Sequence, residues 1–137
     1  MRKSKIIESV TIVLPLPDKK LSPNRPTGSR GSRMAKARIT KRYRQTAWAI
    51  ALNERVATGP WERAQATLVF YWPDRRRRDI RNAEAAMKAA YDGIVDAGIL
   101  ADDSYDVLTH KPTQFKLDRE HPRVEILIQR LTEGNEA

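Results

Sequence analysis

The stretch DRRRRDIRNAEAAMKAAYDGIVDAGILADD, residues 74–103, predicts both a principal helix of the fold and the chemistry of the chain. A run of four arginines stands directly before Asp79, and a second pair of carboxylates, Asp102 and Asp103, ends the stretch. Clustered carboxylates can hold a hard divalent cation such as Mg²⁺. The adjacent arginines reverse the local negative field and would attract a phosphate backbone. This combination fits metal-dependent chemistry on nucleic acid.

Within this stretch, residues 83–97 are predicted to form a helix. Apolar side chains recur there at the i, i+3, i+4, i+7 spacing of one helix face. The members of this stripe are Ala83, Ala86, Met87, Ala90, Tyr91, Ile94 and Val95. Asn82 suits the N-cap position and Gly98 the C′ position. Lys88 lies opposite the stripe, where Glu84 and Asp92 stand at i, i+4 spacing and could form ordinary surface pairs with it.

Outside this helix, the sequence predicts an α+β fold in a single domain, residues 1–137. Short apolar runs predict strands at residues 10–14, 66–72, 105–117 and 123–131. Residues 35–56 predict a first helix, which Gly59 and Pro60 end. The order β-α-β-α-β-β indicates a small mixed sheet with two helices packed against it.

Two segments are predicted to lack regular structure. Residues 18–34 are rich in proline, glycine, serine and basic side chains, which predicts a flexible basic loop. This loop either becomes ordered on DNA or simply connects two elements. Residues 133–137 are expected to be a frayed tail.

The composition points to a polyanionic partner. The chain carries 26 basic and 17 acidic residues, a formal charge of +9, and its basic residues collect at 30–44 and 74–81. Such an excess is most often a footprint for nucleic acid. The absence of cysteine excludes disulfides, zinc–thiolate sites and cysteine nucleophiles. The two histidines, His110 and His121, are too few for a histidine-rich metal site and are expected to lack a catalytic role.

No membrane partner is expected. No apolar run approaches the length that crosses a bilayer, and the N-terminal residues lack the apolar core of a signal peptide. A cytoplasmic protein is therefore the default expectation.

The central stretch resembles the signature of RusA-type Holliday-junction endonucleases, which are common in phages and prophages. The matching residues are Asp79, Asn82, Lys88, Asp92, Gly98, Asp102 and Asp103. A looser likeness lies upstream, in the LPLP run at 14–17, the SPN run at 22–24 and a basic helix with Lys41 and Arg44. The sequence departs from the family pattern at Arg81, which stands at the second aspartate of the D-x-D-N motif.

The resemblance implies a Mg²⁺-dependent nuclease with a RusA-like fold and no nucleotide cofactor. Asp79 and Asp103 would be catalytic metal ligands, with Asp102 the weaker candidate. Lys88 would stabilise the charge that builds on the scissile phosphate. The substrate would be four-way junction DNA, and its paired nicks would require a symmetric homodimer.

The DNA-binding residues are expected to be basic side chains of the arginine run and of the first helix. They are Arg75, Arg76, Arg77, Arg78, Arg81, Lys41 and Arg44. Planar guanidinium groups can bind phosphates bidentately. A solvated, charged turn is the plain alternative for the four consecutive arginines.

Other interpretations remain open at this point. Asp79 could simply be a carboxylate at a helix N-terminus, and Asp102 and Asp103 could cap a turn. Because Arg81 would repel Mg²⁺, the protein could instead be a junction- or DNA-binding protein that has lost catalysis, unless Glu84 or Asp106 replaces the missing ligand. An RNA-binding or ribosome-associated protein would explain the charge but not the carboxylates.

Overall fold

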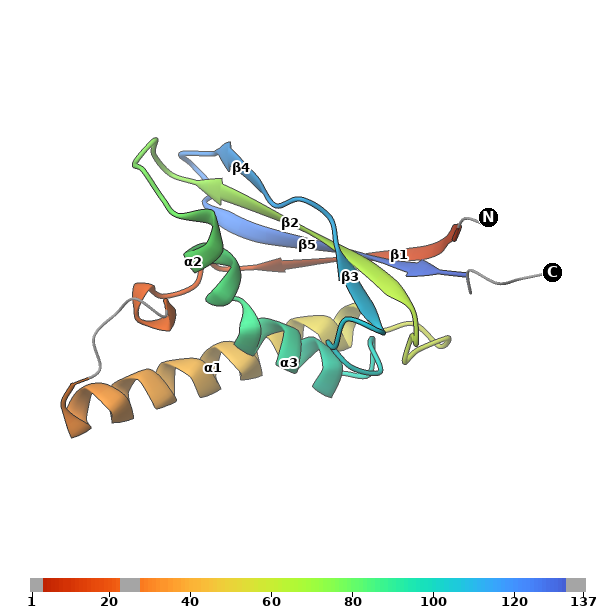
Figure 1. Ribbon diagram of the computed structural model, residues 1–137, viewed down its shortest axis with the longest axis horizontal. Helices are drawn as coiled ribbons and strands as arrows, with labels where there is room; N and C mark the ends of the chain where they lie inside the picture. Colours follow the sequence, from red (N-terminus) through yellow and green to blue (C-terminus); the bar gives the residue numbers. More distant parts are fainter. Residues whose placement is uncertain (1–3, 23–27, 133–137) are drawn as a thin grey trace.

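A computed structural model describes residues 4–22 and 28–132 and shows a small α+β domain, as predicted. A five-stranded mixed sheet has its helices on one side (Figure 1). In chain order the elements are β1 (Ile6–Leu14), the 3-10 turn η1 (Lys19–Leu21), α1 (Arg30–Glu54), β2 (Ala64–Trp72), α2 (Ile80–Ala85), α3 (Lys88–Asp96), β3 (Leu108–His110), β4 (Gln114–Leu117) and β5 (Arg123–Leu131).

The sheet is built around β5, which pairs antiparallel with both β1 and β2. The other side of β2 pairs in parallel with β3 near its start and with β4 near its end. The single strand predicted at 105–117 is therefore wrong, because it is two short strands separated by residues 111–113. Pro112 lies in this gap and has no backbone N–H to donate to a ladder.

The core lies between the sheet and the two longer helices. Side chains of β2 and β5 alternate between buried and half-buried positions, so one face of the sheet is packed. The fully buried sheet residues include Ile12, Phe70, Val124, Ile126 and Ile128. Helices α1 and α3 lie side by side below this face (Figure 1).

The α1–α3 contact depends on a glycine. A Cβ atom built on Gly93 would lie 2.3 Å from the Arg44 carbonyl oxygen and 2.9 Å from the Ala47 Cβ. Ala47 and Ala51 on the facing side of α1 are fully buried. The small side chains therefore let the two helix backbones approach closely enough to bring residues of α1 next to those of α3.

Helix α1 begins at Arg30 rather than at residue 35, so part of the predicted loop 18–34 is helical. The Ser29 hydroxyl accepts the Ser32 N–H at 3.0 Å and caps the helix, which offsets the low helix propensity of Gly31. Residues Lys19–Leu21 form a short turn capped by Asp18. Residues 23–27 of that loop and the predicted tail at 133–137 lie outside the described residues.

The helix predicted at 83–97 is also different in the structure, because it is two helices. Ala86 and Met87 separate α2 from α3, and the Met87 side chain is fully buried. Asp79, not Asn82, is the N-cap, so α2 starts earlier than predicted. Gly98 has a φ of 84° and follows the C-cap Ala97, which confirms the predicted C′ position.

Both ends of the described chain lie at one end of the sheet. Ile6 pairs with Leu131, and Lys5 and Thr132 exchange hydrogen bonds of 2.9 Å. The β2–α2 turn and the start of α1 lie at the opposite end (Figure 1). Of the helices in the described ranges, none combines the length and the apolar character needed to cross a bilayer.

Candidate active site and nucleic-acid interface

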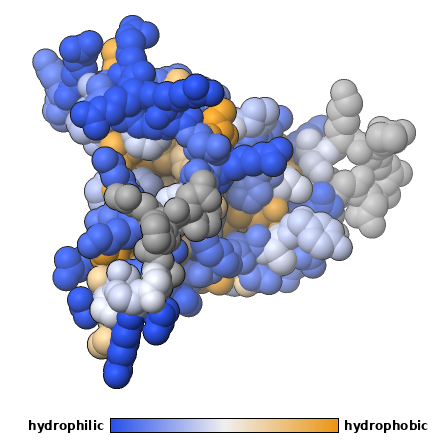
Figure 2. All heavy atoms as spheres, turned by 60° about the vertical axis from the view of Figure 1, so that its left-hand side comes forward, coloured by the Kyte–Doolittle hydropathy of each residue, from blue (hydrophilic) through white to orange (hydrophobic). Residues whose placement is uncertain are grey.

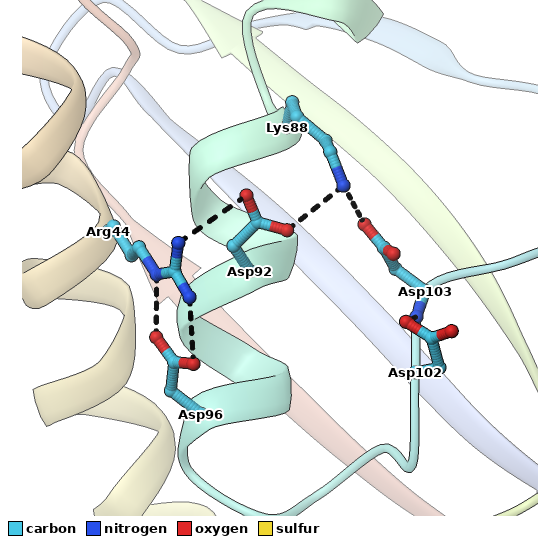
Figure 3. A network of polar contacts seen from close by, with 6 residues as sticks. All are labelled: Arg44, Lys88, Asp92, Asp96, Asp102 and Asp103. Atoms are coloured by element: carbon cyan, nitrogen blue, oxygen red, sulfur yellow. Dashed lines mark hydrogen bonds and ion pairs between the residues drawn. The ribbon is translucent and has the colours of Figure 1, made fainter. Parts of the chain in front are cut away.

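A chain of alternating charges joins α1, α3 and the loop after α3 (Figure 3). The Lys88 ammonium donates to Asp92 Oδ1 at 3.0 Å and to Asp103 Oδ2 at 2.6 Å. On the other side of Asp92, the Arg44 guanidinium lies 4.0 Å from its carboxylate and binds both oxygens of Asp96, at 2.7 and 3.0 Å. The predicted Lys88–Asp92 pair is thereby confirmed, and Asp103 is added to it.

These contacts stabilise the charged forms of Lys88 and Asp103 at neutral pH. Hydrogen bonds to Asp103 first, and then to Asp92, raise the pKa of Lys88 above its usual value. The hydrogen bond from Lys88 lowers the pKa of Asp103. The Lys88 side chain is 66% exposed, whereas the Asp103 side chain is 20% exposed. An ionised carboxylate next to an exposed ammonium is a pair of groups that could bind a phosphate together with its counter-cation.

Lys88 and Asp103 line a hollow of about 580 Å³, called here the Lys88 hollow. Its lining combines an apolar floor with side chains from α2, α3, β3 and the loop between α3 and β3. The lining residues are Leu68, Glu84, Ala85, Lys88, Tyr91, Asp103 and His110. The chain reaches this arrangement because the passage from β2 through α2 and α3 to β3 returns to the same sheet edge.

The predicted pair of Glu84 with Lys88 is wrong, because the Glu84 carboxylate accepts a hydrogen bond from the Thr113 hydroxyl and Lys88 contacts Asp92 and Asp103 instead. Lys88 was predicted to lie opposite the apolar stripe to which Tyr91 was assigned. Both line the hollow, because Tyr91 stands three residues after Lys88 and is its neighbour on the helix. That spacing was the available signal for Tyr91, whereas His110 carried none.

Asp79 lies at the start of α2 and has a structural role there. Its Oδ1 accepts the Asn82 N–H at 3.1 Å and caps the helix. It lines a different hollow, of about 410 Å³, together with Trp72 and Arg78. Among the hollows lined by described residues, Asp79 and Asp103 thus fall in separate ones. Their predicted sharing of one metal ion stays a prediction.

Asp102 is exposed, and its Oδ1 accepts the backbone N–H of Asp103 at 2.8 Å. This contact is the turn-capping role that adjacent aspartates often have. It also fixes the backbone from which the Asp103 carboxylate extends toward Lys88 (Figure 3). Asp102 therefore positions Asp103, and its own ligation of a metal stays a prediction.

The donor set of the Lys88 hollow fits Mg²⁺ as two carboxylates. Proteins commonly bind Mg²⁺ through one or two carboxylates, with waters and substrate phosphates completing the octahedron. Asp103 and Glu84 supply such oxygens from one hollow. Across residues 4–22 and 28–132, no cluster of three or more acidic or histidine side chains could hold a metal ion. A cation held by Asp103 and Glu84 would therefore take its remaining ligands from water and substrate.

Of the arginines around the start of α2, some are held by contacts within the protein and others form no ion pair among the described residues. The Arg78 guanidinium stacks over Trp72, with its Cζ 4.2 Å from the ring centroid, and binds Asp74 Oδ1 at 2.7 Å. Arg76 lies 3.5 Å from the same carboxylate. In the described part of the chain no ion pair involves Arg75, Arg77 or Arg81, and all three are exposed.

A basic groove runs along α1, called here the α1 groove. Its lining residues fall on one helix face and are Arg33, Lys36, Ala37, Thr40, Lys41 and Arg44. The helix rises about 16 Å from Arg33 to Arg44, roughly the length of five base pairs. Cations near a helix N-terminus oppose the helix dipole. Of the groove cations, Arg33 lies in the first turn of α1 and is subject to this effect.

The space-filling view shows this end of the molecule from outside. In Figure 2, hydrophilic atoms gather over the upper and the lower lobe of the visible face, and apolar atoms are visible between the two lobes. The view brings forward the end that carries the β2–α2 turn and the start of α1. The arginine turn and the α1 groove therefore belong to one end of the protein.

We expect Arg75 and Arg77 to contact phosphate directly. Replacing both by alanine should reduce the slope of log K against log[salt] for DNA binding by about 1.8, or roughly 0.9 for each lost contact. Fluorescence anisotropy with a labelled duplex at several salt concentrations measures this slope. The matched control removes two cations at the other end of the sheet, Lys5→Ala with Arg63→Ala, and should leave the slope unchanged. Equal slopes for both double variants would place the arginine run away from DNA.

The chain matches no model of a known protein family. No curated protein sequence is significantly similar to it.

Proposed function

We propose that this protein is a Mg²⁺-dependent endonuclease that cuts four-way DNA junctions in recombination and repair, in the cytoplasm. The observation that carries the proposal is the Lys88 hollow, in which two carboxylates and an ammonium meet beside a basic surface. Arg44, which lines the α1 groove, lies 4.0 Å from Asp92, and Asp92 contacts Lys88. The groove and the hollow are thus joined by one chain of ion pairs (Figure 3).

The residues of the hollow would have different roles in the reaction. Asp103 and Glu84 would hold the metal ion, and Asp79 remains a candidate ligand through the family resemblance. When bound, Mg²⁺ polarises the phosphodiester and makes a bound water more acidic. Lys88 stays protonated because its two carboxylate partners raise its pKa. It can donate to a non-bridging oxygen and stabilise the charge that builds in the transition state.

The junction substrate rests on the resemblance to RusA-type endonucleases, on the residues given above. Resolution of a four-way junction requires two symmetric nicks, so the active form would be a two-fold homodimer with two hollows. The polar surface and the unpaired arginines support a nucleic-acid substrate in general.

A nicking assay tests the proposal. The wild-type protein should cut a synthetic four-way junction with Mg²⁺, should fail to cut it with EDTA, and should leave a linear duplex of the same arm sequence uncut. Sedimentation on the same samples should give twice the monomer mass of 15.7 kDa. Equal cutting of junction and duplex would refute the junction substrate, and no cutting at any Mg²⁺ concentration would refute the enzyme.

A junction-binding protein without catalysis is the second candidate, and three observations favour it. Arg81 is an exposed cation one helical turn before Glu84 on α2. Asp79 is engaged as a helix cap, and Asp103 is neutralised by Lys88. Each of these features weakens the attraction of the site for a divalent cation.

Replacing Arg81 by aspartate separates the two candidates. The change removes a positive charge and adds an oxygen ligand, so we expect tighter Mg²⁺ binding and faster junction cleavage, with somewhat weaker DNA binding. Isothermal titration with Mg²⁺ and a nicking time course measure the two effects. Slower cleavage than in an active wild type would mean that Arg81 itself binds phosphate. Absence of Mg²⁺ binding in both forms would favour the non-catalytic binder.

A further inference from the structure

The Tyr91 hydroxyl is buried in the wall of the Lys88 hollow without a hydrogen-bond partner among the described residues. The side chain is only 6% exposed, and its ring packs edge-on against His110, with centroids 5.4 Å apart. A buried hydroxyl without a partner is costly, and phenylalanine would fill the same space without that cost. The ring alone therefore does not account for a tyrosine here.

Tyr43 provides the comparison within the same chain. It is buried to the same extent, at 7% exposure, but its hydroxyl donates to the Pro15 carbonyl oxygen at 2.7 Å. Tyr43 thus has a structural reason for its hydroxyl. Tyr91 has none in the described part of the fold, and its side chain lines the hollow that Lys88 and Asp103 also line.

The chemistry of the hollow selects the kind of group that this hydroxyl would meet. Burial first, and then the nearby Glu84 charge, raise the pKa of Tyr91, so the hydroxyl stays protonated and can donate. Lys88 stands three residues earlier on α3, so two hydrogen-bond donors lie next to each other on one helix face. Two adjacent donors suit a ligand that only accepts hydrogen bonds, and the non-bridging oxygens of a phosphodiester are such a ligand.

We propose that Tyr91 is a substrate-binding residue, whose hydroxyl donates to a non-bridging oxygen of the phosphodiester that enters the Lys88 hollow. This inference rests on the proposed function, because the carboxylates of Glu84 and Asp103 would repel a phosphate unless a divalent cation is bound with it. Tyr91 lies outside the residues that carry the family resemblance. Its assignment rests on the buried hydroxyl without a partner and on the other residues that line the hollow.

The first measurement is the stability of two matched variants. In urea unfolding, Tyr43→Phe should lower the midpoint, because a partnered hydroxyl is lost. Tyr91→Phe should leave the midpoint unchanged or raise it. A midpoint lowered as far by Tyr91→Phe as by Tyr43→Phe would overturn the proposal, since it would show a structural partner for the Tyr91 hydroxyl.

The second measurement is ligand binding by NMR on the full chain with ring-labelled tyrosine. The signal missing in Tyr91→Phe identifies Tyr91. The dinucleotide dTpT, which holds one phosphodiester, should shift this signal in the presence of Mg²⁺, and thymidine, which has the base and the sugar but no phosphate, should not. Tyr91→Phe should weaken dTpT binding by about tenfold, as expected for a lost hydrogen bond to a charged acceptor.

The outcomes separate this inference from the proposed function. If the protein cuts no junction but shows the Mg²⁺-dependent dTpT shift at Tyr91, the phosphate contact of Tyr91 is supported and the enzyme proposal is refuted. If the protein cuts junctions but dTpT does not shift the Tyr91 signal, the Tyr91 proposal is refuted and the enzyme proposal stands. An equal shift with thymidine would overturn the phosphodiester contact and would mean that the hollow binds a nucleoside.

Discussion

Replacing Asp103 by asparagine is expected to slow junction cleavage by about 100-fold or more while junction binding is retained or becomes tighter. The change keeps the size of the side chain but removes the proposed metal ligand and the charge that holds Lys88 at 2.6 Å. Loss of metal-assisted charge stabilisation of about 3 kcal/mol corresponds to roughly 100-fold in rate. Binding is spared because one negative charge facing DNA disappears. Nicking and gel-shift assays on the same samples measure the two effects.

Two further asparagine variants extend this prediction. Asp102→Asn keeps the oxygen that accepts the Asp103 N–H, so slower cleavage in this variant would report a metal ligand lost at Asp102. Asp79→Asn keeps a good N-cap, so its effect reports the lost charge rather than an unfolded α2. Loss of cleavage is expected here too, as the family resemblance implies. Wild-type rates in both Asp79→Asn and Asp103→Asn would refute the site.

Replacing Gly93 by alanine should lower the free energy of unfolding by about 3 kcal/mol, at the upper end for overpacked cores. The added Cβ would lie 2.3 Å from the Arg44 carbonyl oxygen, which is backbone and cannot move aside like a flexible side chain. Helices α1 and α3 must separate to accept it. Urea unfolding followed by circular dichroism measures the change.

Gly31 is the matched control for this substitution. It also lies in a helix, but the nearest atom to an added Cβ is the Ser29 hydroxyl oxygen at 4.0 Å. Gly31→Ala should therefore leave the protein as stable or stabilise it by up to about 1 kcal/mol, because alanine favours the helix. Equal unfolding free energies for the two variants would mean that the α1–α3 contact is looser than described.

Elements with a strong local signal were predicted well from the sequence. Alternation along residues 123–131 matches β5 as observed, and the apolar run at 66–72 lies in β2, the strand between β5 and the short parallel strands. The break between α2 and α3 left no such signal, because Ala86 and Met87 continue the apolar stripe. The deep burial of Met87, a property of the tertiary fold, accompanies the break.

In the candidate site, too, the contacts between residues close in sequence were predicted and the long-range contacts were not. The pair of Lys88 with Asp92 follows from i, i+4 spacing, whereas the contact of Lys88 with Asp103 spans 15 residues and needs the return of the chain to the sheet. The capping role of Asp79 was predictable, since aspartate is among the best N-cap residues. The division of the arginines was not, because Arg78 is held by the stacking ring of Trp72.

The hydrogen bonds between Lys5 and Thr132 give the molecule a natural point of attachment. Both residues lie at the end of the sheet away from the β2–α2 turn and the start of α1 (Figure 1). A tether or a fluorescent fusion joined there would leave the arginine turn facing solution. Immobilised molecules could then be tested one by one for capture and release of labelled four-way junctions, the substrate that we propose. The same geometry would let a short linker join the two strands, so that a circularly permuted chain could be opened elsewhere.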